Sequence, residues 1–82
     1  MNYFDELLQS NDDLIKNAAT MLDQITSQYQ TKQITEAEYR ELCNNVLDYQ
    51  QVVSNVTDMD RKQLIWTAFQ QLYTIVSAIL QL

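Results

Sequence analysis

Carboxylates are prominent among the side chains of this sequence that could do chemistry. They stand in close groups at Asp12 and Asp13, Glu38 and Glu41, and Asp58 and Asp60. Carboxylates spaced along helices can hold a metal ion or act as a paired acid and base. The chain has no histidine, however, so the Glu-x-x-His motifs of a helical di-metal site cannot form. We therefore expect these acids on solvated faces and at helix starts, with no metal bound.

The single cysteine, Cys43, has no histidine to activate it as a nucleophile. Its neighbours at helical spacing are apolar, so we expect a free thiol in the core. Phosphate-binding loops depend on glycine, and the chain has none. The sequence thus predicts a protein that is not an enzyme and needs no cofactor.

The charge distribution argues against nucleic acid as a partner. The formal net charge is −6, and the five basic residues are scattered between Lys16 and Lys62. They form no row that could neutralise successive phosphates. A partner is therefore expected to be a protein.

The elements that position these residues are predicted to be helices. The 82 residues fit one domain, residues 1–82, and a chain of this size often gains stability from oligomerisation. Glycine and proline, on which the tight turns of β-folds rely, are both absent. We predict an all-α, antiparallel three-helix bundle that self-associates, with helices at about residues 3–30, 36–55 and 58–81.

A heptad pattern predicts the first helix. Its members recur at steps of 4 and 3 residues: Phe4, Leu8, Asn11, Ile15, Ala18, Leu22, Ile25 and Tyr29. Ser10 or Asn11 could instead cap a later start, but the pattern runs through both, which favours one helix over residues 3–30. Asn11, the one polar member, would set the register of a partner helix.

The second helix has the clearest start. Thr35 and Glu38 match the capping box, in which each side chain accepts a hydrogen bond from the other residue's amide. Ile34 and Tyr39 are placed for the hydrophobic staple that often accompanies this motif. The short connection at residues 31–35 predicts an antiparallel hairpin with the first helix.

A change of phase separates the second and third helices. The second helix has an apolar row at Tyr39, Leu42, Val46, Tyr49, Val53 and Val56. Continued at the same steps, this row meets only polar residues after Asp60. We expect a break at residues 55–58, either a full turn, with Asn55 in a strained conformation because no glycine is available, or a kink.

The segment 63–82 has no charged residue, which is unusual for a solvated helix face. Six of its polar residues form one row on a helix, which we call the polar stripe: Gln63, Thr67, Gln70, Thr74, Ser77 and Gln81. We expect the stripe to be enclosed by its own chain, by other copies or by a partner, since these side chains can hydrogen-bond across an interface without burying charge. Trp66, beside the stripe, could fill the core or anchor an interface. We predict an interface made of the stripe, Trp66 and Asn11.

Two other functions compete with assembly. Residues 63–82 reach the length of about 20 residues that spans a bilayer, and Arg61 and Lys62 precede them, but seven polar residues argue against a span. The acidic chain could also inhibit a host enzyme by occupying a basic site. The acidic N-terminus lacks the features of a signal peptide, so we expect a cytoplasmic protein.

Residues 33–42, QITEAEYREL, resemble a helix-opening phrase of many short helical hairpins. The whole chain, which is small, acidic, helical and rich in Gln and Asn, resembles the accessory and structural proteins of tailed bacteriophages. That resemblance implies a role in virion assembly, or as an inhibitor or sponge of a host system, in the host cytoplasm or the virion. It assigns no role to any individual residue.

Overall fold

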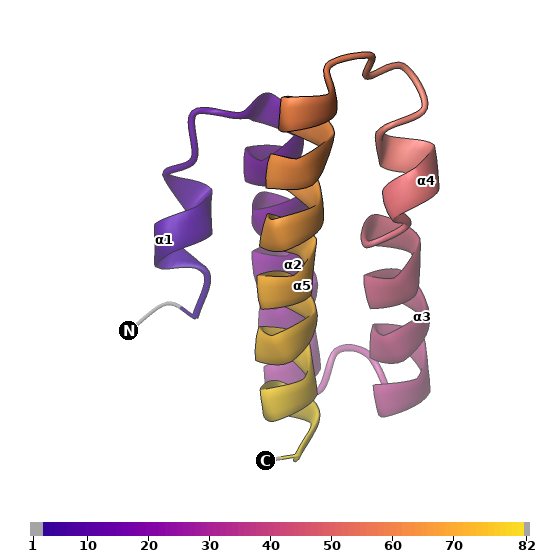
Figure 1. The fold of residues 1–82 in the computed structure, drawn as a ribbon. Coiled ribbons are helices and arrows are strands. Elements are labelled where there is room, and N and C mark those ends of the chain that lie inside the picture. Colours follow the sequence, from indigo (N-terminus) through magenta and orange to yellow (C-terminus); the bar gives the residue numbers. More distant parts are fainter. Residues whose placement is uncertain (1–2, 82) are drawn as a thin grey trace.

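The computed structural model describes residues 3–81, and within this range all regular structure is helical (Figure 1). The helices are α1 (Asp5–Leu8), α2 (Asp13–Gln30), α3 (Glu36–Val46), α4 (Tyr49–Val52) and α5 (Met59–Gln81). The predicted domain and the predicted C-terminal segment also include Met1, Asn2 and Leu82, which lie outside the described residues. The prediction of an all-α chain is confirmed, whereas the three unbroken helices are not.

Helix α2 lies at the centre of the arrangement. Its backbone contacts α1, α3 and α5, and α4 packs against α5. In Figure 1 the chain runs along α2, reverses into α3 and α4, and reverses again through a loop into α5. The predicted break at residues 55–58 is therefore a full turn and not a kink.

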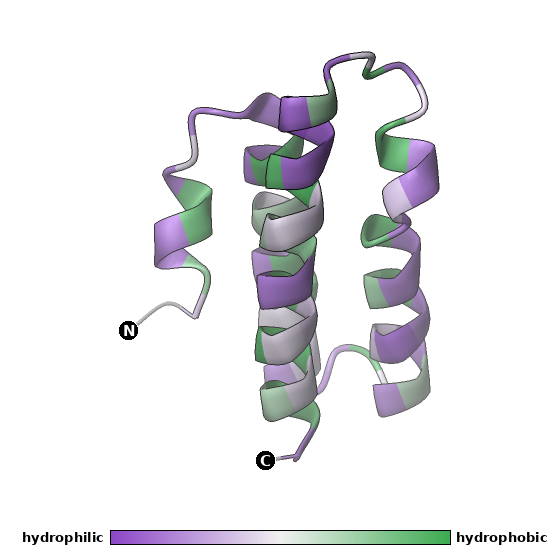
Figure 2. Ribbon diagram, in the orientation of Figure 1, coloured by the Kyte–Doolittle hydropathy of each residue, from purple (hydrophilic) through white to green (hydrophobic). Residues whose placement is uncertain are grey.

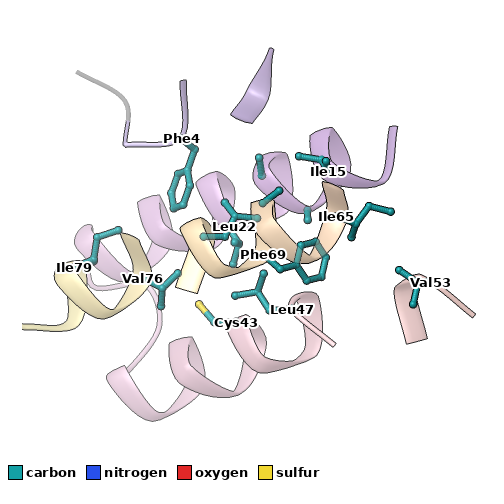
Figure 3. Packing of buried hydrophobic residues seen from close by; sticks show 14 of the residues in the cluster. Phe4, Ile15, Leu22, Cys43, Leu47, Val53, Ile65, Phe69, Val76 and Ile79 are labelled. Carbon is teal, nitrogen blue, oxygen red and sulfur yellow. The ribbon is translucent and has the colours of Figure 1, made fainter. Parts of the chain in front are cut away.

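Apolar side chains from all parts of this arrangement meet in one core. Figure 3 shows Phe4, Leu22, Cys43 and Phe69 directed toward one another from different segments. The buried apolar residues are Phe4, Ile15, Ala18, Ala19, Leu22, Tyr39, Cys43, Leu47, Val53, Val56, Ile65, Ala68, Phe69, Leu72, Val76 and Ile79. Burial of each large side chain contributes roughly 1.5–3 kcal/mol before the loss of conformational entropy is counted.

The predicted helix over residues 3–30 is wrong, because the chain leaves the helix between α1 and α2. Asp12 caps α2, and its carboxylate accepts hydrogen bonds from the amides of Leu14 (2.9 Å) and Ile15 (3.4 Å). The same carboxylate binds Arg61, with 2.8 Å between Nε and Oδ2. A continuous helix would forfeit both interactions. Asn11 consequently lies exposed in the loop and belongs to no helical row.

The predicted helix over residues 36–55 is also interrupted, at Leu47 and Asp48. The Asp48 side chain accepts a hydrogen bond from the Gln51 amide (3.3 Å) and starts α4. At the end of α3, the Leu47 carbonyl accepts a hydrogen bond from the Tyr73 hydroxyl of α5 (3.4 Å). This contact occupies a carbonyl that the helix end leaves without an intrahelical partner. Leu42, a member of the predicted row, is 37% exposed.

The capping box at the start of α3 is confirmed. The Thr35 hydroxyl accepts a hydrogen bond from the Glu38 amide (3.1 Å), and the Glu38 carboxylate accepts one from the Thr35 amide (2.9 Å). These hydrogen bonds lower the pKa of the Glu38 carboxyl. Helix α5 begins in a related way, since the Asp58 carboxylate accepts a hydrogen bond from the Asp60 amide (2.9 Å).

A hydroxyl pair joins α2 and α3 inside the core. Thr26 and Tyr39 are both buried, and their hydroxyl oxygens lie 2.6 Å apart. The Tyr29 ring stacks on Tyr39 with 4.6 Å between centroids. Burial raises the pKa of Tyr39 to about 12 and also raises the pKa of the neighbouring Cys43 thiol. Cys43 is a buried free cysteine, as predicted, in its neutral and weakly reactive form.

Helix α2 ends in a Schellman motif that uses a lysine in place of the usual glycine. The Gln33 amide donates to the Gln28 carbonyl (2.8 Å), and the Lys32 amide donates to the Tyr29 carbonyl (3.1 Å). Lys32 has a φ of 64° and is the only residue of the described range with positive φ. The strained conformation expected at Asn55 is therefore found at Lys32 instead.

Replacement of Lys32 by glycine should stabilise the protein. A left-handed conformation costs a residue with a Cβ roughly 1–2 kcal/mol, and the greater freedom of glycine in the unfolded chain offsets part of the gain. We expect Lys32→Gly to raise the free energy of unfolding in urea by up to about 1 kcal/mol. The matched control, Gln24→Gly in the exposed interior of α2, should lower it by about 1 kcal/mol. Equal decreases in the free energy of unfolding of the two variants would contradict the assignment of a strained left-handed conformation to Lys32.

The Asp12–Arg61 pair predicts a specific dependence of stability on pH. The Asp12 carboxylate accepts hydrogen bonds from the Arg61 side chain and from the Leu14 and Ile15 amides, and these hydrogen bonds lower the pKa of the Asp12 carboxyl. The resulting stabilisation is complete above the ordinary carboxyl pKa and is lost as the pH falls through the lowered folded-state pKa. Asp12→Asn retains a capping side chain but removes the charge. Its urea midpoint should therefore lie below that of the wild type at pH 7, and the difference should shrink between about pH 4 and pH 2.

The control for this experiment is Asp13→Asn, an exposed neighbour in the first turn of α2. Its midpoint should fall by less than that of Asp12→Asn, because Asp13 acts on Arg61 and on the start of α2 through its charge and does not cap the helix. A difference for Asp12→Asn that is as large at pH 2 as at pH 7 would show that the ion pair does not stabilise the fold.

Candidate interaction surface

The polar stripe occupies the outer face of α5. Each of its six residues is exposed, whereas Ile65, Leu72 and Ile79 on the opposite face are buried. The stripe therefore faces away from the core. Of the three enclosures expected for the stripe, enclosure by its own chain is excluded.

The polar side of α5 is also visible in its colouring. Figure 2 shows hydrophilic and weakly coloured residues along the side of α5 that is turned outward. Within the stripe, the Thr74 hydroxyl donates a hydrogen bond to the Gln70 carbonyl (3.0 Å), so its oxygen is free to accept from another molecule. A shallow hollow of about 390 Å³ lies over this region, lined by Gln70, Tyr73, Thr74, Ser77, Ala78 and Gln81.

A second row of residues borders the stripe on one side. Met59, Trp66 and Tyr73 follow one another at steps of seven residues, which places them on the same side of α5. Their exposed fractions are 72%, 46% and 40%, so each leaves a large apolar or aromatic surface uncovered. We call these three residues the apolar flank.

The two aromatic residues of the apolar flank are held in place by α3 and α4. The Trp66 ring meets the Tyr49 ring edge to face, with 5.1 Å between centroids and 77° between planes. The Tyr49 hydroxyl in turn donates to the Lys62 carbonyl (3.2 Å). Tyr73 is fixed by the hydrogen bond from its hydroxyl to Leu47. Trp66 thus packs partly on the core and partly faces outward, and a partner would lose little side-chain entropy on binding it.

The opposite border of the stripe faces α1. Leu64 is 54% exposed there. Farther along α5, a shallow hollow of about 310 Å³ is lined by Tyr3, Glu6, Leu7, Gln71, Thr74 and Ile75. This border has less aromatic surface than the apolar flank.

The outer face of α5 and the surface of α3 differ sharply in charge. Residues 63–81 have no charged side chain, although the chain has a net charge of −6. The surface of α3, in contrast, exposes Glu36, Glu38 and Glu41. Two copies of the chain repel each other overall, and the outer face of α5 lets them approach without bringing like charges into contact.

Asn11 does not belong to this surface. It is exposed in the α1–α2 loop, and its neighbour Asp12 binds Arg61 near the beginning of α5. The structure thus brings together seven of the predicted interface residues and leaves Asn11 beyond one end of the stripe. Met59 and Tyr73 were missed as surface residues, although their seven-residue spacing from Trp66 was a usable signal.

The remaining chemistry of the described residues is limited. Within residues 3–81, no group of three or more His, Cys, Asp and Glu side chains is placed to hold a metal ion. None of the helices in that range combines the length and apolar character required to cross a bilayer.

Comparisons of the chain with protein-family models, with curated proteins and with solved structures found no match. The resemblance to phage proteins therefore stays a prediction.

Proposed function

We propose that this protein is a non-catalytic assembly module that acts by contacts with protein, in the first place with further copies of itself. In this proposal an antiparallel three-helix bundle, made of α2, α3 with α4, and α5, serves as a scaffold. It presents the outer face of α5 as the contact surface.

The observation that supports the proposal best is the combination on α5 of an uncharged polar stripe with an apolar flank that includes two fixed aromatic residues, Trp66 and Tyr73. Most solvated helix faces have Lys and Glu, which keep copies apart. Here these residues are absent over residues 63–81 of an otherwise acidic chain. Trp and Tyr dominate the energetics of protein interfaces, and Gln, Thr and Ser can pair across one without the cost of burying charge.

The runner-up function is that of an acidic inhibitor that occupies a basic site on a host enzyme. The exposed carboxylates of α3 favour it. Self-association would use the uncharged surface of α5, whereas an inhibitor would use the exposed carboxylates of α3. The two functions therefore predict opposite responses of binding to salt.

Self-association should be visible in sedimentation velocity runs over a range of protein concentrations. We expect the wild type to gain mass with concentration, and Gln70→Glu to weaken association at least about tenfold, because two introduced charges would be forced together. Trp66→Ala should weaken it as well, since an exposed aromatic anchor is removed. Gln24→Glu on α2 is the matched control, with the same change in net charge and no expected effect. A wild type that stays monomeric at every concentration would overturn the proposal.

The response to salt provides an independent test. Salt screens the repulsion between two chains of charge −6, so association of copies should strengthen as NaCl is raised from about 50 mM to about 500 mM. An acidic inhibitor bound to a basic site would respond in the opposite way, with weaker binding in high salt. Self-association that falls with salt would show that charged residues, and not the face of α5, form the contact.

A further inference from the structure

The polar stripe has the same pattern in both directions along α5. Its steps are 4, 3, 4, 3 and 4 residues, so the row is symmetric about the level of Leu72. Read from the two ends inward, glutamine matches glutamine at Gln63 and Gln81, and hydroxyl matches hydroxyl at Thr67 and Ser77. At the centre, Gln70 matches Thr74, an amide with a hydroxyl. Every one of these pairs can both donate and accept hydrogen bonds.

From this symmetry we infer that two copies of the chain pair α5 on α5, in antiparallel directions, about a two-fold axis near the level of Leu72. A two-fold contact uses the same patch on both molecules, so the patch must be complementary to itself. The stripe fulfils that condition pair by pair. This inference rests on the proposed self-association and adds the geometry of the contact.

The apolar flank decides between antiparallel and parallel pairing. In an antiparallel pair, each border of the stripe meets the same border of the second copy. Trp66 then lies beside Leu80 of the second copy, and Tyr73 lies beside its own counterpart at the axis. In a parallel pair the apolar flank would meet the opposite border, where Leu64, Gln71 and Ala78 stand, so only Trp66 would meet a large apolar side chain. The antiparallel pair therefore buries aromatic against aromatic and apolar surface, which is the more favourable contact.

The charges at the beginning of α5 favour the same direction. Asp58, Asp60, Arg61 and Lys62 stand within or next to its first turn, and Asp12 is bound there as well. A parallel pair would place these groups beside their own copies. In the antiparallel pair each charged end meets the uncharged end of the other α5, and the two helix dipoles are opposed.

The size of the contact sets the conditions of the test. One helix on each side, with a stripe about 27 Å long at 1.5 Å per residue, lies at the small end of specific interfaces. The dimer is accordingly a weak one, so the experiments require protein concentrations of tens to hundreds of micromolar.

Disulfide formation between copies tests the direction of pairing. Thr67→Cys and Ser77→Cys replace exposed residues of the stripe, and the buried native Cys43 serves as the internal background. In the antiparallel dimer, a mixture of the two variants should form an inter-chain disulfide under mild oxidation. Each variant alone should not, because two Thr67 positions lie about 15 Å apart along the axis and a disulfide needs Cα atoms within about 7 Å. Gln63→Cys with Gln81→Cys is a second pair with the same expectation.

The outcomes separate the inference from the proposed function. Disulfides within each single variant, and no mixed disulfide between Thr67→Cys and Ser77→Cys chains, would establish a parallel pair, which overturns the inference and leaves self-association standing. A dimer in sedimentation that forms no disulfide in any sample would place the contact elsewhere and overturn the inference. A monomer in every sample would overturn both. Gln24→Cys on α2, which should form no disulfide in any mixture, controls for random collision.

Discussion

The burial of one face of α5 against the rest of the chain decides which residues the molecule presents to its surroundings. Ile65 and Leu72 are fully buried, and Ile79 is nearly so. Because a helix has only one rotation that buries these residues together, the polar stripe must face outward and the apolar flank must lie beside α4. The exposed surface of α5 is thus a direct consequence of its core contacts.

Contacts between residues far apart in the sequence position the α1–α2 loop, the beginning of α5 and the end of α3. The Asp12 carboxylate serves α2 as a cap and holds Arg61, so one side chain positions both the α1–α2 loop and the beginning of α5. Tyr73 performs a similar double role, since its hydroxyl binds the end of α3 while part of its ring stays exposed. Trp66 and Tyr73 of the apolar flank are thus held by contacts that also connect α5 to the preceding segments.

The sequence pattern predicted the helices correctly where local signals and burial agree. The capping box at Thr35 placed the start of α3, and the change of phase after Asp60 together with the polar stripe placed α5. Ser10 and Asn11 offered an alternative start close to that of α2, but the apolar rows continue through the breaks after α1 and after α3 and favoured unbroken helices. What decides these breaks is contact with residues far along the chain, Arg61 for Asp12 and Tyr73 for Leu47. The exposure of Trp66 depended likewise on Tyr49, which no spacing rule identifies.

The separation of 49 residues between Asp12 and Arg61 has a consequence for the order of folding. Contacts between α2 and α3 close a short turn and can form early, whereas those between α2 and α5 must close a long loop and form late. During synthesis α5 also leaves the ribosome after α2 and α3. Until α5 is in place, the apolar surface of α2 that it contacts stays uncovered and open to chaperones and proteases.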